Sequence, residues 1–279
     1  AYARCLTRFS KTTINQSGSY LKVINEYKSK GYVLCKNFVS TEKLKTLETV
    51  LISFQEAWTK AHKEFYESQA VNSAYLTGTK YLSSDQRMTL FSFVCQEKLL
   101  QFASELIPEG PAFMNTQLFF NPVNPDQKNY WHRDIQYNGM SIADQRKIIQ
   151  RINVIHFRIP VRDEPGMEFV PGSHVAWDTN KEQDVRLANN GCAVSDDLST
   201  GVKVPLKAGD LLIFSANMIH RGLYGGDRLS FDILLCDRDP DLLAFAALDC
   251  LPDENQIAKL AHSELFTATR RCMKTAEPE

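Results

Sequence analysis

The fold of this chain is decided by a stretch in which polar and apolar residues alternate. Residues 152–161 read INVIHFRIPV. Successive side chains of a β-strand point to opposite faces, so His156 and Arg158 would share one face. The other face would be apolar and would carry Ile155, Phe157, Ile159 and Val161. The stretch therefore predicts a strand with one polar face and one solid apolar face.

Two neighbouring runs fit the same kind of sheet. In residues 113–120, FMNTQLFF, the side chains of Asn115 and Gln117 would share a face. Residues 209–215, GDLLIFS, are almost continuously apolar, as expected for a strand buried on both sides. Pro, Gly, Asn and Asp separate such runs, which is typical of an all-β core.

A fourth run repeats the polar face. In residues 228–235, RLSFDILL, Arg228, Ser230 and Asp232 would point one way and the apolar residues the other. Several strands would thus turn polar side chains toward a common interior. This favours a β-barrel or a two-sheet sandwich with a polar mouth, wrapped on the outside by helices.

Helical patterns flank this β region. A short helix is expected over 20–29, ending at Gly31, and another over 95–107. Apolar residues recur at helical spacing over 44–58, after Ser40, which can cap that helix. We expect a single, mainly β domain over 1–279. Its parts would be a helical N-terminal part (about 1–110), a β core (about 111–237) and a helical C-terminal tail (about 238–279).

Composition excludes several classes of partner. The chain has 279 residues, 43% of them hydrophobic, and a net charge of −1. Bulk charge gives no reason to expect nucleic acid, and no window is apolar enough to span a membrane. Seven cysteines without a C-x-x-C pair favour reduced thiols in an intracellular, cytoplasmic setting. Because the chain begins with Ala1, removal of an organelle-targeting peptide stays open.

The chemistry starts from an H-x-D pattern. His132 and Asp134 would face the same side of an extended segment, and both are metal-ligand types. A third ligand must come from elsewhere, and His220, at the end of a predicted strand, is the best candidate. Two histidines and one carboxylate leave three coordination positions open, which suits non-haem Fe(II).

A further pattern follows His220 by eight residues. Arg228 and Ser230 would project from one face of a neighbouring strand. A planar guanidinium can bind a carboxylate through two hydrogen bonds, and a hydroxyl can add another. The pair therefore suits a dicarboxylate, which a plain metal-binding jelly roll would not need.

Together these pieces resemble the phytanoyl-CoA dioxygenase-type (PhyH) branch of the Fe(II)/2-oxoglutarate-dependent oxygenases. The similarity covers roughly 20–235, in the family's order. The matching pieces are GYVLCKNFVS, WHRD, GMEFVPGSH, KAGDLLIFSANMIH and RLS. The resemblance implies a double-stranded β-helix, the cupin-like jelly roll. It also implies Fe(II), 2-oxoglutarate and O₂ as cofactor and cosubstrates, with ascorbate as a stimulant.

The resemblance assigns roles to individual residues. The metal ligands would be His132, Asp134 and His220. The cosubstrate would be bound by Arg228, with Ser230, Gln117 and Arg158 beside it. Two positions depart from the family: Arg133 stands where Gln is frequent, and Gly222 stands where many relatives carry a serine.

Interior polar residues suggest a substrate. His156, Arg133 and Asn115 are the candidate contacts, and they indicate a polar, carboxylate-bearing small molecule of secondary metabolism. Other roles stay open for three residues. Arg133 could be solvated, His156 could be a core histidine, and Arg158 could pair with a carboxylate of the protein or of a ligand. The reaction would be hydroxylation, oxidative cyclisation or desaturation, with succinate and CO₂ as co-products.

Two further questions stay open in the sequence. The alternative to an oxygenase is a jelly-roll metal-binding module or a non-oxidative cupin-type enzyme. The polar segment 177–201 is either a lid or a tolerated surface insertion. We expect the protein to act on a small molecule, without nucleic acid, as a monomer or weak homo-oligomer.

Overall fold

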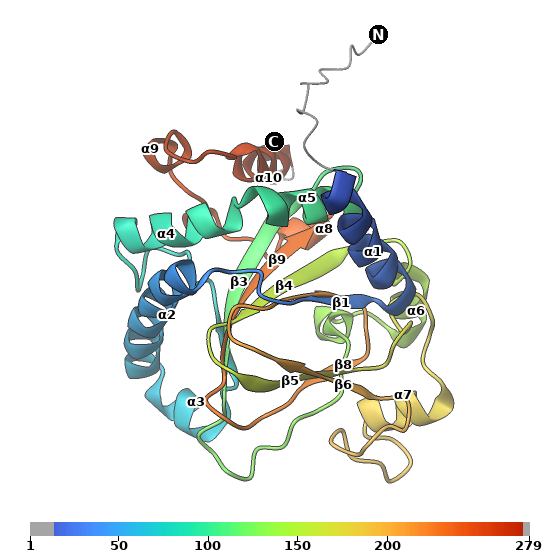
Figure 1. Ribbon diagram of the computed structural model, residues 1–279. Helices are drawn as coiled ribbons and strands as arrows, with labels where there is room; N and C mark the ends of the chain where they lie inside the picture. The colour runs from blue at the N-terminus through green and yellow to red at the C-terminus, as the bar shows by residue number, and fades with distance from the viewer. Residues whose placement is uncertain (1–13, 276–279) are drawn as a thin grey trace.

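The computed structural model describes residues 14–275 and contains two antiparallel sheets (Figure 1). The larger sheet has the strand order β1-β7-β4-β9-β3-β2. Its strands are β1 (Tyr32–Cys35), β2 (Asn72–Ala74), β3 (Ala112–Phe120), β4 (Val154–Pro160), β7 (Leu211–Ser215) and β9 (Leu229–Cys236). The smaller sheet has the order β6-β5-β8. Its strands are β5 (Glu164–Phe169), β6 (Val202–Leu206) and β8 (His220–Gly222).

Helices precede, interrupt and follow the strands. The long ones before β3 are α1 (Ile14–Lys30), α2 (Thr41–Ala61), α4 (Ser84–Val94) and α5 (Glu97–Leu106), and α10 (Glu264–Thr275) comes last. Shorter ones are α3 (Lys63–Ser68), α6 (Ile142–Ile148), α7 (Asn180–Arg186), α8 (Pro240–Leu243) and α9 (Glu254–Ile257), with 3₁₀ turns η1 (Asp134–Asn138) and η2 (Leu248–Cys250). The long helices lie on the side of the larger sheet away from β5, β6 and β8 (Figure 1).

The alternation in the strands explains this layering. Ile155, Phe157 and Ile159 of β4 lie in one continuous core with apolar residues of β3, β9 and the helices. From α2 this core receives Leu47, Val50, Leu51, Phe54 and Trp58, the stripe expected from helical spacing. Ser40 caps α2 by accepting a hydrogen bond from the Lys43 amide, as predicted. The helices are therefore held by the apolar face of the larger sheet.

β7 contributes to two cores because it is buried on both faces. Leu211 and Ile213 pack on the helical side. Leu212 and Phe214 pack against Phe169 and other residues of the smaller sheet. The prediction of a strand buried on both sides over 209–215 is confirmed. The two sheets thus face each other, and their polar residues are left to line the space between them.

The prediction of a mainly β chain is wrong. More of the described residues lie in helices than in strands, because several short helices fill the connections as well as the ends. Segment 177–201, expected to be irregular, contains α7, whose first turn is capped by Thr179. β1 and β2 precede the expected β core in the chain and form the two edges of the larger sheet.

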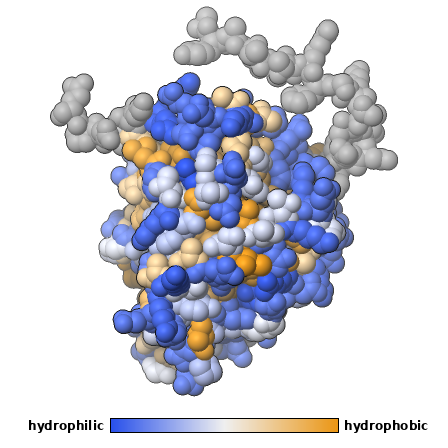
Figure 2. All heavy atoms as spheres, turned by 90° about the vertical axis from the view of Figure 1, so that its left-hand side faces the viewer, coloured by the Kyte–Doolittle hydropathy of each residue, from blue (hydrophilic) through white to orange (hydrophobic). Residues whose placement is uncertain are grey.

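The surface agrees with the composition. The face that carries α2 and α4 is mostly hydrophilic, with hydrophobic residues scattered over it (Figure 2). Among the described residues, no helix is long and apolar enough to cross a membrane. Cys35, Cys95, Cys192, Cys236 and Cys250 are free thiols, whereas Cys5 lies outside the described residues.

Candidate metal centre and cavity

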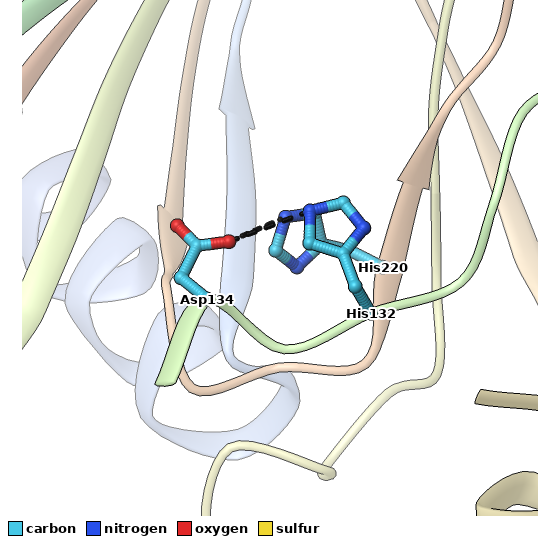
Figure 3. Close-up of side chains that lie close together, drawn as sticks. All are labelled: His132, Asp134 and His220. Carbon is cyan, nitrogen blue, oxygen red and sulfur yellow. Dashed lines mark ion pairs between the residues drawn. The ribbon is translucent and has the colours of Figure 1, made fainter. Parts of the chain in front are cut away.

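Two chain segments bring three metal-ligand side chains together. His132 and His220 form an isolated antiparallel bridge, with amide-to-carbonyl distances of 3.0 and 2.9 Å. Since residues paired in this way share a face, the two imidazole rings lie beside each other, with centroids 4.3 Å apart. Asp134 begins η1 two residues later and turns its carboxylate toward both rings (Figure 3).

The donor atoms converge on one point. Asp134 Oδ1 lies 3.4 Å from His132 Nε2 and 3.4 Å from His220 Nε2. One ligand atom from each of the three residues lies within 4.8 Å of the others, so one ion can contact all three. Two imidazoles and a carboxylate on one side of an ion leave room for further ligands, as in non-haem iron enzymes.

Backbone carbonyls orient both histidines. His132 Nδ1 lies 3.1 Å from the Tyr130 carbonyl, and His220 Nδ1 lies 3.0 Å from the Met218 carbonyl. Because a carbonyl only accepts, each Nδ1 carries the proton and each Nε2 keeps its lone pair for a metal. Burial, followed by the neighbouring His132, lowers the pKa of His220 to about 3. His220 is therefore neutral, which is the form that binds a metal.

His156 holds the second oxygen of the metal-binding carboxylate. Its Nε2 lies 2.8 Å from Asp134 Oδ2, and its Nδ1 lies 3.0 Å from Asp232 Oδ2. Burial alone would lower the pKa of His156, but the two carboxylates raise it to about 9. Burial would likewise raise the pKa of Asp134, but the neighbouring His132 and His156 bring it well below its usual value. The charged His156 thus binds Oδ2 of Asp134 and leaves Oδ1 free to face a metal ion between His132 and His220.

We call His132, Asp134 and His220 the metal group. These three residues open onto a cavity of about 340 Å³. The pairing of β3 with β9 gives the order of the residues along the floor of this cavity. Phe119 pairs with Ser230 at one end, Gln117 with Asp232 in the middle, and Asn115 with Leu234 at the other end. Arg228 precedes β9 and therefore lies at the Phe119 end. Met114 and Leu234 line the cavity at the Asn115 end, and the other lining residues include Tyr75, Phe245, Tyr137 and Asn138.

Arg228 is a buried cation whose hydrogen-bonding capacity is largely unused. Nη1 is 3.3 Å from the Phe120 carbonyl, and Nε has no hydrogen-bond partner among the described residues. The carboxylate of Glu164 lies 3.9 Å from Nε, too far for a hydrogen bond. Burial lowers the pKa of Arg228 to about 10, so the group stays charged near neutral pH. Free donors on a buried cation at a cavity wall suit an anionic ligand.

The structure separates the remaining candidates. Gln117, Arg158, His156 and Asn115 all line the cavity. Ser230, expected beside the cosubstrate, lies outside the cavity lining instead. Its hydroxyl donates a hydrogen bond to Glu164 Oε2 at 2.8 Å. The hydroxyl expected to serve the cosubstrate is therefore bonded to a protein carboxylate.

The question left open for Arg158 is answered by Asp232. Nε and Nη2 of Arg158 lie 3.0 and 2.6 Å from Asp232 Oδ2. Its charge is therefore balanced by the protein and does not require a ligand. The guanidinium also stacks over Phe119, 3.9 Å from the ring centroid. Asp232 was recognised in the sequence as part of a polar strand face, but its partners were not.

Arg133, expected either as a substrate contact or as a solvated side chain, is found in neither place. It is neither solvated nor part of the cavity: the side chain is fully buried, and it pairs with Asp178 at 2.6 Å. Alternation along an extended segment already turns it away from His132 and Asp134. Nothing in the sequence marked Asp178 as its partner, because that residue stands in a polar segment without periodicity.

The family model for phytanoyl-CoA dioxygenase (PhyH) matches residues 27–223. The chain belongs to this family. The resemblance read from the sequence motifs is thereby confirmed. The match includes His132, Asp134 and His220 and ends before Arg228. A comparison with the sequences of curated proteins gives no significant match.

Solved structures share the fold at low sequence identity. The epimerase SnoN, in complex with Fe³⁺, alpha ketoglutarate and nogalamycin RO, is 18% identical with a TM-score of 0.54, over 80% of this chain and 85% of its own. The carbocyclase SnoK from nogalamycin biosynthesis is 18% identical with a TM-score of 0.54, over 78% and 84%. HygX from Streptomyces hygroscopicus, with nickel and 2-oxoglutarate bound, is 13% identical with a TM-score of 0.56, over 77% and 86%.

Family membership and the His-Asp-His group together support Fe(II) and 2-oxoglutarate as the predicted cofactors. The donor set fits the metal, since it combines neutral imidazoles with an ionised carboxylate. The unused donors of Arg228 fit the distal carboxylate of the cosubstrate.

Proposed function

We propose that this chain is an Fe(II)- and 2-oxoglutarate-dependent oxygenase that oxidises an unactivated C–H bond of a small molecule. One observation carries the proposal: the three metal-ligand residues and the underpaired Arg228 line the same cavity. A cupin-type metal module has no use for a buried arginine with free donors. In this proposal the two facing sheets form the double-stranded β-helix typical of such enzymes.

When bound, Fe(II) and 2-oxoglutarate would supply activation of O₂, with oxidation of the substrate coupled to decarboxylation of 2-oxoglutarate to succinate and CO₂. The chain's own residues position the participants. His132, Asp134 and His220 would hold the ion, and Arg228 would orient the cosubstrate through its distal carboxylate. Gln117 would border the cosubstrate from the neighbouring strand β3, since its side chain lines the same cavity.

The substrate end of the cavity supports a different substrate from the carboxylate expected earlier. Of the described residues that line the cavity, Arg158 and Arg228 alone carry a permanent positive charge. Arg158 is neutralised by Asp232, and Arg228 lies at the cosubstrate end. The opposite end presents Met114, Leu234 and Phe245. We therefore propose a substrate with a largely apolar body.

Neutral hydrogen-bonding groups remain available to orient this substrate. Asn115 Oδ1 accepts from the amides of Tyr75 and Thr116, at 3.1 and 2.7 Å. This fixes the amide group so that its Nδ2 can donate to a substrate carbonyl or hydroxyl. Asn138 and Tyr137 add further polar atoms. The nogalamycin enzymes SnoN and SnoK, an epimerase and a carbocyclase, support a product of secondary metabolism. Hydroxylation, cyclisation and desaturation all remain within the proposal.

The test is formation of succinate from 2-oxoglutarate with Fe(II), O₂ and ascorbate, measured with and without a panel of apolar and carboxylated substrates. We expect slow succinate formation without substrate, faster formation with apolar substrates, and none with Asp134→Ala. Retention of Mn(II) without any succinate would instead identify the metal-binding or non-oxidative alternative. A carboxylated compound as the best substrate would refute the proposed apolar class.

A further inference from the structure

A cluster of buried charges lies behind the metal group, on the side away from the cavity. We call Arg133, Asp178, Arg186 and Gln136 the support cluster. Arg133 and Arg186 are 0% and 1% exposed, and neither lines the cavity. Two arginines at this depth are costly unless their charges and N–H groups are matched. The residues that line the cavity do not explain why these two arginines are buried.

The matching is complete for Arg133. Its Nε and Nη2 donate to Asp178 Oδ1 at 2.9 and 2.6 Å, and Nη2 also donates to the Ala176 carbonyl at 3.1 Å. Nη1 donates to the carbonyls of Ser173 and Asn217. A guanidinium has five N–H groups, and these five contacts use all of them. No donor is left for a substrate or cosubstrate.

Asp178 joins the second arginine to the first. Its Oδ2 accepts from Nε and Nη2 of Arg186 at 2.9 and 2.6 Å. Nη1 of Arg186 donates to Gln136 Oε1 at 2.9 Å, and the Arg133 amide donates to the same oxygen at 3.2 Å. Through Gln136, the cluster therefore also fixes the turn η1 that begins with Asp134.

One acceptor of Arg133 comes from the segment that carries the third metal ligand. Arg133 itself stands between His132 and Asp134. Asn217, whose carbonyl it binds, precedes His220 by three residues and lies in the turn before β8. Asn217 is in turn held by its Nδ2, which donates to the carbonyls of Ile149 and Ile152 at 3.0 and 2.9 Å. One guanidinium thus fixes the H-x-D segment to the segment of the third ligand.

We propose that Arg133 is a positioning residue for the metal group, and that Asp178 and Arg186 hold it in place. This inference rests on the proposed function, since it assumes that His132, Asp134 and His220 bind the metal. It also assigns a role to the first part of segment 177–201. Residues 178–186 are a fixed support of the metal group, because a lid movement would break the two hydrogen bonds from Arg133 to Asp178 and the hydrogen bond from Arg186 to Gln136.

The test compares metal binding in variants that lose a buried arginine at two places. Arg133→Met removes the five hydrogen bonds beside the metal group. Arg87→Met is the matched control, because Arg87 is also buried and donates to the carbonyls of Thr77, Asp249 and Leu251, outside the cavity. Mn(II) binding by the full chain with 2-oxoglutarate is measured by calorimetry, and the folded fraction by circular dichroism. The Co(II) absorption spectrum reports the ligand geometry.

We expect Arg133→Met to weaken Mn(II) binding about 10- to 100-fold at equal folded fraction, as loss of outer partners of metal ligands does. Its Co(II) spectrum should change, whereas Arg87→Met should keep the wild-type affinity and spectrum. Arg133→Lys, with charge but only three N–H groups, should be intermediate. If Arg133→Met does not fold, Arg133→Lys and Asp178→Asn decide the question.

Wild-type Mn(II) affinity in the folded Arg133 and Asp178 variants would overturn this inference alone. Equal losses in Arg133→Met and Arg87→Met would also overturn it, because they would indicate a general loss of stability. Absence of Mn(II) binding in the wild-type protein would overturn the proposed function as well.

Discussion

Arg133 and Arg228 are both buried arginines near the metal group, yet their surroundings differ in kind. All five N–H groups of Arg133 meet acceptors of the protein, and Asp178 balances its charge. Arg228 has one long hydrogen bond, an Nε without a partner and a carboxylate only at 3.9 Å. Burial therefore does not distinguish a structural arginine from a ligand-binding one. The unused donors do, because a buried donor without an acceptor is stable only if a ligand or water supplies one.

The support cluster should show the largest effect, on stability. Asp178→Ala leaves Arg133 and Arg186 buried without their shared carboxylate. Removing one partner of a buried ion pair typically costs about 3–5 kcal/mol. We expect a loss of this size in the free energy of unfolding, measured by urea denaturation of the metal-free protein. A loss below about 1 kcal/mol would contradict the role of Asp178 as the shared partner of the two arginines.

Arg228 should show the converse, a large effect on ligand binding. Arg228→Met removes the cation proposed to bind the distal carboxylate of 2-oxoglutarate. Losing such a buried charged contact costs about 2–4 kcal/mol, or roughly 30- to 1,000-fold in affinity. We expect this loss in the Kd for 2-oxoglutarate with Mn(II) present, with a smaller loss of stability than in Asp178→Ala. An unchanged Kd would remove the main support for the cosubstrate site.

A substitution of His156 tests whether Asp134 Oδ2 needs a hydrogen-bond partner. His156→Phe keeps a planar ring but removes the hydrogen bonds to Asp134 and Asp232, while Arg158 still neutralises Asp232. We expect Mn(II) binding to weaken about 10-fold or more, as for other outer partners of metal ligands. The KM for 2-oxoglutarate should change less than the metal affinity. The opposite order would assign His156 to the cosubstrate.

A substitution at Gly222 should give the smallest effect. It tests how much free space lies beside Arg228. A Cβ at this position would lie 2.7 Å from Arg228 Nη2, too close for both to keep their places. A side chain larger than glycine at this position would therefore displace this arginine. Since the far end of an arginine can shift, we expect Gly222→Ala to raise the Kd for 2-oxoglutarate only about 3- to 10-fold, or roughly 1 kcal/mol. A thermal melting curve like that of the wild-type protein would confirm that the effect is local.

Much of the site could be predicted from local patterns. The period-2 alternation in β3, β4 and β9 placed Gln117, His156 and Arg158 on interior faces, because a strand fixes which side chains share a side. The H-x-D spacing placed His132 and Asp134 on one side for the same reason, and His220 was chosen as the third ligand because it ends a predicted strand. Helical spacing over 44–58 located the stripe that packs on the sheet. The proportion of helix was misjudged, since short helices such as α7 leave little periodic signal.

By itself, then, the sequence determined which side chains face the interior, the likeness to the phytanoyl-CoA dioxygenase family and the composition of the metal group. The tertiary structure alone decided how the interior charges are paired. Asp232 stands 76 positions from His156, and Asp178 stands 45 positions from Arg133. Strand periodicity gives the direction of a side chain but not its partner across the fold. That partner decides whether a buried charge is satisfied, and so whether it is left to bind a ligand.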